Sequence, residues 1–265
     1  MGLWELISLE MDYSGETIGD YFENTLGRKI RRNKYVRKEV KQENKETVCN
    51  ITRRAVAGGQ DKKLVVYGCG YYHHYTYGLC KYADRLSEDY GYIHFDHHED
   101  YWREDMKKDY LRGFSKPRLN KDRNRIDCGS FVADILYDTN ASALLLVGST
   151  LNRAVPKMLK DKPHESLSEK QFRNKTGMDM FKRRLDKLPE DVYLSFDLDV
   201  MEIKYIETAY SQGTLKPKEL MAMIEAIKSS KNIISADVLA YGGLYNRTKP
   251  GRKLYREIVD SLMEA

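Results

Sequence analysis

Short apolar runs alternate with longer segments of mixed polarity along most of this 265-residue chain. Five runs are apolar along most of their length, which is typical of buried strands. The segments between them carry helix signals, with Ser168 as an N-cap and Pro217 in a first helical turn. Such alternation predicts an α/β fold whose mostly parallel sheet is covered on both faces. The expected strands are 64–68, 92–95, 144–148, 192–196 and 233–238, and the expected helices are 71–86, 168–188, 217–228 and 252–263.

The length suits one domain of this class, and we expect residues 1–265 to form a single domain. Residues 1–60 have the weakest pattern, and a helical N-terminal extension would lie there. Within them, residues 31–38 form a basic run with the sequence RRNKYVRK. We expect this run to be one face of an exposed helix, with contact to an anionic partner as the alternative.

Composition argues against several classes of protein. No stretch of about 18 apolar residues is present, as a transmembrane span would need. The N-terminus lacks the basic and apolar regions of a secretory signal. The four cysteines form no C-x-x-C pair, and a net charge of +5 is too small to indicate nucleic-acid binding. We therefore expect a cytoplasmic protein with reduced thiols that binds neither nucleic acid nor a membrane.

Five of the six histidines fall within residues 73–98, close to several carboxylates. The segment 96–100 directly follows an expected strand and reads Asp-His-His-Glu-Asp. Because alternate side chains of an extended chain share a direction, Asp96, His98 and Asp100 should point the same way. Asp197 and Asp199 repeat this spacing at the end of another expected strand. Ligands of parallel sheets bind beyond the carboxyl ends of strands, so the two groups should converge.

Four carboxylates and one imidazole in one place would repel one another strongly without cations. Two divalent ions about 3.5–4 Å apart would neutralise most of this charge, whereas one ion would leave much of it unpaired. Mn(II) suits a ligand set rich in carboxylates, and Zn, Fe and Co are open alternatives. The sequence therefore predicts a site for two metal ions, with two Mn(II) ions per chain as the first expectation.

These motifs resemble the signatures of the ureohydrolase family, which comprises arginases, agmatinases and formiminoglutamases. Segment 96–100 matches the family's Asp-Ala-His-x-Asp, and segment 195–203 (SFDLDVMEI) matches Ser-Phe-Asp-x-Asp-x-x-Asp-Pro except at its end. His73 and Gly78 match the His of the Gly-Gly-Asp-His-Ser motif and the Gly that follows it. Segment 213–220 (GTLKPKEL) is similar to the helix start Gly-Gly-Leu-Thr-x-x-Glu-Leu. The resemblance adds His73 as a sixth metal ligand.

The resemblance implies a three-layer α/β/α sandwich of the arginase type with a binuclear Mn(II) centre. It implies agmatinase- or arginase-like hydrolysis of linear C–N bonds in guanidino or amidino compounds, by a hydroxide that Asp100 orients between the ions. It further implies small-molecule substrates and a homo-oligomer, either a trimer or a hexamer. By the same resemblance, one ion is held by His73, Asp96, Asp100 and Asp197, and the other by Asp96, His98, Asp197 and Asp199.

Three positions depart from the family pattern. Cys128 stands where many members have a proton-shuttling His, and it either moves a proton or packs beside the site. Ala240 stands where the family has a Glu that holds the guanidinium, so a charged contact is missing. Glu202 replaces the Asp of an Asp-Pro pair and faces either substrate or solvent. We expect His74, Ser130 and Glu202 to bind substrate.

Residues 107–125 are strongly basic and would run over the mouth of the site in this fold. A basic rim would attract a substrate with a negative group and repel agmatine, with a solvated charged loop as the alternative. Two other functions stay open. One is a metal-binding relative without hydrolase activity, and the other is a deacetylase-like amide hydrolase with a single Zn ion.

Overall fold

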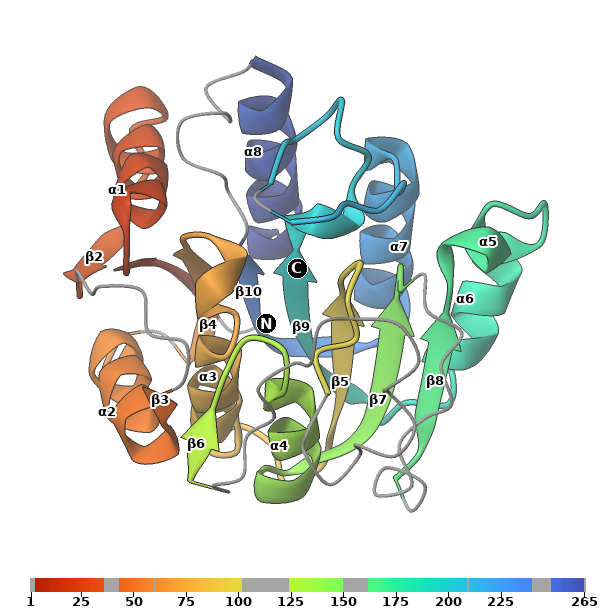
Figure 1. Cartoon of the computed structure of the whole chain (residues 1–265), viewed down its shortest axis with the longest axis horizontal. Coiled ribbons are helices and arrows are strands. Elements are labelled where there is room, and N and C mark those ends of the chain that lie inside the picture. The colour runs from red at the N-terminus through yellow and green to blue at the C-terminus, as the bar shows by residue number, and fades with distance from the viewer. Residues whose placement is uncertain are drawn as a thin grey trace.

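The central sheet is built from strands that all run in one direction. The computed structural model describes residues 3–35, 43–59, 61–101, 124–149, 162–208, 210–239 and 249–264. The sheet contains β1 (Trp4–Glu10), β2 (Arg31–Lys34), β4 (Lys62–Tyr67), β5 (Tyr90–Phe95), β7 (Ala141–Val147), β8 (His164–Leu167), β9 (Asp191–Asp197) and β10 (Asn232–Leu239). They lie in the order β2-β1-β4-β10-β9-β5-β7-β8, and each neighbouring pair is parallel (Figure 1). The predicted parallel sheet is confirmed.

Helices cover both faces of this sheet and complete three layers. One face packs in a buried apolar cluster against α2 (Lys45–Val56), α3 (Tyr75–Ala83) and α4 (Phe131–Asp138). The other face packs in a second cluster against α1 (Tyr13–Asp20), α6 (Gly177–Leu185), α7 (Pro217–Ser230) and α8 (Lys249–Met263). The predicted α/β/α sandwich is therefore confirmed. None of the helices in the described ranges has the length and apolar character that a bilayer crossing requires.

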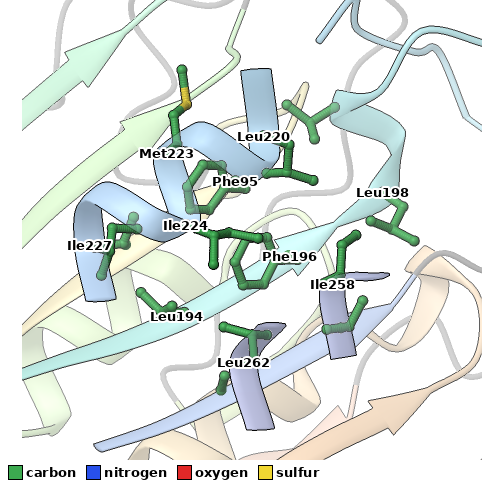
Figure 2. Packing of buried hydrophobic residues seen from close by; sticks show 14 of the residues in the cluster. Phe95, Leu194, Phe196, Leu198, Leu220, Met223, Ile224, Ile227, Ile258 and Leu262 are labelled. Carbon is green, nitrogen blue, oxygen red and sulfur yellow. The ribbon is translucent and has the colours of Figure 1, made fainter. Parts of the chain in front are cut away.

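Phe95 and Phe196 pack into the core beneath α7 and α8, which fixes the orientation of the side chains next to them in β5 and β9. Phe95 of β5 and Phe196 of β9 stack with their ring centroids 4.6 Å apart. Because successive side chains of a strand point to opposite faces, the neighbours of these two residues point toward α3 and α4. Figure 2 shows the helices covering the stacked pair with Leu220, Met223, Ile224, Ile227, Ile258 and Leu262.

The strands and helices expected after residue 60 are found, with one helix divided in two. The five predicted strands correspond to β4, β5, β7, β9 and β10. The predicted helix 168–188 is two helices, α5 (Glu169–Phe172) and α6. The chain turns between them at Gly177, where a Cβ atom would lie 2.1 Å from the carbonyl oxygen of Phe172. Only glycine tolerates that approach.

The N-terminal residues contribute two strands that the sequence pattern does not indicate. β1 pairs with β4, and β2 pairs with β1 at the sheet edge. The prediction of an exposed helix is wrong for Arg31–Lys34, which form β2, while the last three residues of that basic run lie outside the described residues. The Arg32 guanidinium contacts the carboxylates of Glu10, Asp20 and Glu23. The charge of Arg32 is therefore paired with carboxylates of this chain, and Arg32 gives no support to contact with an anionic partner. Apart from the main sheet, β3 (Glu43–Asn44) pairs antiparallel with β6 (Arg125–Ile126).

Candidate metal centre

The predicted ligands converge at the carboxyl ends of β5 and β9, which are neighbours in the sheet. The register pairs His94 with Ser195, so Asp96 and Asp197 leave the two strands at the same level. His73 comes from a third segment, the turn that connects β4 to α3. This is where ligands bind in open parallel sheets.

A deep cluster is centred on His73, whose side chain is 1% exposed. His73 Nδ1 lies 3.2 Å from Asp96 Oδ2, 3.2 Å from Asp100 Oδ2 and 3.4 Å from Asp197 Oδ2. His94 Nε2 approaches the same Asp96 Oδ2 to 3.2 Å. Four of the predicted ligands and one further histidine therefore meet at one buried point.

An outer cluster adjoins the deep one through Asp96. His98 Nδ1 lies 2.8 Å from Asp199 Oδ2 and 3.3 Å from Asp96 Oδ1. Asp96 thus turns one carboxylate oxygen to each cluster. The His98 side chain is 34% exposed, whereas those of Asp96 and Asp199 are 1% exposed. The outer cluster is therefore the more exposed of the two.

Several donor atoms of the two clusters are buried without a hydrogen bond. Within the described part of the chain, His73 Nδ1, His94 Nε2, Asp96 Oδ2 and Asp199 Oδ2 have no hydrogen-bond partner. Buried polar atoms of this kind are costly unless an ion satisfies them. Carboxylate and imidazole donors are those that first-row divalent metals bind. The residues therefore fit a metal centre. Candidate ligand atoms within 4.8 Å of one another come from His73, His94, Asp96 and Asp100 in one group, and from Asp96, His98 and Asp199 in another.

The crowded groups shift one another's pKa. Burial and the charge of Asp96 raise the pKa of Asp197 to about 7. Burial and the charges of Asp197 and Asp96 raise the pKa of Asp199. Burial disfavours the charged form of Asp96 as well, but the close approach of the His73, His94 and His98 rings outweighs burial and lowers the Asp96 pKa. Burial opposes protonation of His98, yet the adjacent carboxylates of Asp199 and Asp96 raise its pKa to about 12. The raised pKa values mean that protons on these side chains offset the negative charge of the carboxylates. A divalent cation bound between them could do the same.

The backbone at Asp100 has an uncommon conformation. Among the described residues, Asp100 is the only one other than glycine with a positive φ, at 48°. Such left-handed residues carry backbone strain and cluster at functional sites. Here the conformation accompanies an Asp100 carboxylate that reaches His73. Across the site, Gly70 permits a close approach, because a Cβ atom there would lie 2.9 Å from the Tyr210 ring and 3.1 Å from Asp197 Oδ2.

A line of buried polar groups supports His73 from behind. Ser195 Oγ donates to Asp237 Oδ1 at 2.8 Å, and Tyr193 donates to Asp237 Oδ2 at 2.6 Å. Because the Ser195 proton is directed to Asp237, its oxygen can accept from His73 Nε2, which lies 3.1 Å away. His73 Nδ1 can then present its lone pair toward the carboxylates. This is the orientation that supporting groups give to metal-binding histidines.

The three predicted substrate contacts have partners of their own. His74 is buried, with Nε2 3.0 Å from Glu43 Oε2. Ser130 is buried and its hydroxyl accepts a backbone hydrogen bond at 3.4 Å. Glu202 is partly exposed and pairs with Lys204 at 2.7 Å. Substrate roles for these three residues therefore stay predictions.

Cys128 is close enough to the centre for its titration to respond to the ligands. Burial, followed by the charge of Asp100, raises the pKa of the Cys128 thiol. At neutral pH the group is therefore a protonated thiol, and its raised pKa makes it a weaker acid than an ordinary cysteine. The Ala240 position and residues 107–123 of the basic segment lie outside the described residues.

Sequence reasoning does not identify three residues at the centre. His94 could have been recognised from the sequence, because it lies two residues before Asp96, the same spacing that separates Asp96 from His98. Ser211 Oγ lies 3.0 Å from His98 Nε2, and the Tyr210 ring centroid lies 6.1 Å from that of His98. Both belong to the loop that follows β9, where no periodic pattern marks them.

Comparison with known proteins places this fold among solved structures. The Bacillus subtilis arginase has 15% sequence identity and a TM-score of 0.68, with 99% of each chain covered. The proclavaminate amidino hydrolase of Streptomyces clavuligerus has 16% identity and a TM-score of 0.63, covering 82% of this chain and 68% of that one. A hypothetical agmatinase from Burkholderia thailandensis has 18% identity and a TM-score of 0.60, with 82% of this chain covered. This chain spans 62% of the length of that agmatinase. No curated protein matches the sequence.

Identities this low establish similarity of fold alone. A sequence model of the arginase family, however, matches residues 18–263. The matched range contains the three segments that meet at the candidate metal centre, and it confirms the family resemblance that their motifs indicate. The chain therefore belongs to the arginase family.

Proposed function

We propose that this chain is a binuclear metal-dependent hydrolase of linear C–N bonds in guanidino or amidino compounds. The observation that carries the proposal is the division of Asp96 between two ligand clusters, one on each carboxylate oxygen. A shared carboxylate can hold two cations at the short separation that such hydrolases use. Membership of the arginase family supports the same reaction class.

Each ion would be held by one cluster, with Mn(II) as the first choice of metal. When bound, the ions supply a nucleophile from water at neutral pH and offset the negative charge of the ligands. Asp96 and Asp197 would contact both ions. The deep ion would add His73 and Asp100, and the outer ion would add His98 and Asp199.

Asp100 is the residue that we assign to orienting the attacking water and taking its proton. Its Oδ2 atom lies 3.2 Å from His73 Nδ1, within the deep cluster. A carboxylate at this position can accept a proton from the attacking water and return it to the departing nitrogen. Cys128 stands at the position of the proton-shuttling His, and its thiol would be a second, weaker proton donor to that nitrogen.

The substrate is proposed to carry a negative group. Ala240 offers no charge for a guanidinium, and the sequence between residues 107 and 125 is strongly basic. Positive charge at a site mouth attracts anions and repels cations such as agmatine. We further propose that the chain works as a single domain, in the cytoplasm, as a homo-oligomer.

The experiment is a substrate panel on the Mn(II)-loaded protein, with urea and ammonia as the measured products. We expect two ions per chain and faster turnover of guanidino acids than of agmatine. Faster turnover of agmatine would contradict the anionic substrate. Two bound ions with no turnover would favour a metal-binding relative without activity, and one Zn ion per chain would favour deacetylase-like hydrolysis.

A further inference from the structure

The deep cluster contains one more imidazole than the proposed ligand set uses. His94 is fully buried, and its ring stacks on that of His73 with centroids 5.0 Å apart and an interplanar angle of 22°. His94 Nε2 and His73 Nδ1 each lie 3.2 Å from the same oxygen, Asp96 Oδ2. Neither nitrogen has a hydrogen-bond partner among the described residues. Two imidazole nitrogens therefore face one carboxylate oxygen.

The strand and its surroundings fix the direction of the His94 ring. His94 and Asp96 are two residues apart, so they share the face of β5 that looks toward the site. The other ring nitrogen, Nδ1, lies 3.0 Å from the Tyr92 hydroxyl. That oxygen can accept the Nδ1 proton, which leaves the lone pair on Nε2. Ser195 supports His73 in the same way.

We propose that His94 is an additional metal ligand at the deep position and makes that position favour Zn(II) relative to Mn(II) more than the outer position does. One ion can contact the whole group, because the candidate ligand atoms of His73, His94, Asp96 and Asp100 lie within 4.8 Å of one another. Imidazole donors suit Zn, Cu, Fe and Ni, whereas carboxylates suit Mn. The deep position has two imidazoles and the outer position has one. The inference rests on the proposed metal centre and not on the substrate.

A different role for His94 would be to hold Asp96 by a hydrogen bond without touching metal. His94→Gln separates the two roles. The Gln amide reaches the place of the imidazole Nε2 and can donate a hydrogen bond to Asp96, but it binds metal poorly. His97→Gln is the matched control, because His97 lies in the same segment with its Nδ1 3.3 Å from Glu169 Oε1. Circular dichroism checks that each variant is folded.

The measurement is the affinity of each full-length protein for Zn(II) and for Mn(II), by competition with a chelating dye. In His94→Gln we expect Zn(II) affinity at the deep position to fall about tenfold or more, the loss that changes even at supporting residues of metal sites cause, and Mn(II) affinity to fall less. In His97→Gln we expect an unchanged ratio of Zn(II) to Mn(II) affinity. An equal loss of affinity for both metals in His94→Gln, or no loss at all, would overturn the proposal.

A second measurement needs no variant. In the Co(II)-loaded wild-type protein, each coordinated imidazole gives a paramagnetically shifted ring N–H signal in the proton NMR spectrum. We expect such signals from three histidines, His73, His94 and His98. Signals from His73 and His98 alone would overturn the ligand role of His94 and leave the proposed function standing. A protein that binds no divalent metal would instead refute the proposed function.

Discussion

At the scale of single residues, Asp96 is the most consequential side chain, because its two oxygens serve different clusters. We expect Asp96→Ala to lose both metal ions and Asp199→Ala to lose only the outer one. Metal content by inductively coupled plasma mass spectrometry measures this as zero ions against one ion per chain. Asp186→Ala, on the exposed end of α6, is the matched carboxylate control. An Asp96→Ala protein that still holds two ions would refute the shared ligand.

A second prediction at this scale concerns Cys128. If its thiol donates the proton, Cys128→Ala should lower kcat about tenfold or more, since general acids typically contribute at least that much. Metal content should stay at the wild-type value, and Cys128→Ser should recover part of the rate because a hydroxyl can also donate. Steady-state kinetics with the preferred substrate measures the effect. An unchanged kcat in Cys128→Ala would assign the residue to packing.

Residue patterns in the sequence identify some of this centre and miss the rest for a physical reason. Asp96, His98 and Asp100 are predictable because they directly follow a buried strand of a parallel sheet. The expected common direction is wrong, because residues 97 and 98 bend and Asp100 has a φ of 48°, which sends His98 and Asp100 to different clusters. His94 has the same spacing, yet it lies inside an apolar strand and reads as part of the core. Tyr210 depends on a loop whose path no local pattern encodes.

At the scale of elements, two strands far apart in sequence form the centre. His97 and Asp199 are hydrogen bonded although 102 positions separate them. Apolar runs predict that each strand exists and that polar residues follow it. They do not specify which strands become neighbours, since strand order depends on the packing of the whole sheet. β2 is missed for a related reason, because Arg32 finds its partners Glu10 and Asp20 in other elements.

Alanine substitutions at two tightly packed glycines, one beside the candidate metal centre and one at the start of α6, test where the surrounding elements lie. Gly70→Ala places a Cβ atom against the Tyr210 ring and Asp197, and Gly177→Ala places one against the backbone between α5 and α6. We expect both variants to lower the free energy of unfolding, by about 1–3 kcal/mol. Gly70→Ala alone should also weaken Mn(II) binding. Chemical denaturation and metal titration measure the two effects. Equal metal affinities in the two variants would contradict the place assigned to Gly70.

At the scale of the whole molecule, metal binding and stability are linked through pH. With its pKa raised from 3.8 to about 7, Asp197 in the folded chain keeps a proton that the unfolded chain has lost. Between these two values the folded state binds more protons than the unfolded state. The contribution of Asp197 to stability is therefore complete below about pH 3.8 and is lost as the pH rises toward about 7. The raised pKa of His98 acts in the same direction above 6.5.

The expected outcome is a Tm that depends on both pH and metal. With a chelator present, Tm should fall by several degrees between about pH 5 and about pH 7.5. Added Mn(II) should raise Tm more at the higher pH, because metal ligands must be deprotonated. Differential scanning calorimetry measures both effects. Asp197→Asn should flatten the pH dependence in chelator, and a wild-type Tm that does not vary with pH would contradict the assigned shifts.

The stacking of Phe95 on Phe196 beneath α7 and α8 separates two kinds of information along the same stretch of chain. At the carboxyl ends of β5 and β9, Phe95 and Phe196 are constrained by packing, and the polar residues beside them by chemistry. A saturation library screened first for expression yield and then for cation retention should separate these neighbouring positions. Substitutions that lower expression yield would have little effect on cation retention, and the reverse. Stability and metal binding could therefore be improved at separate positions.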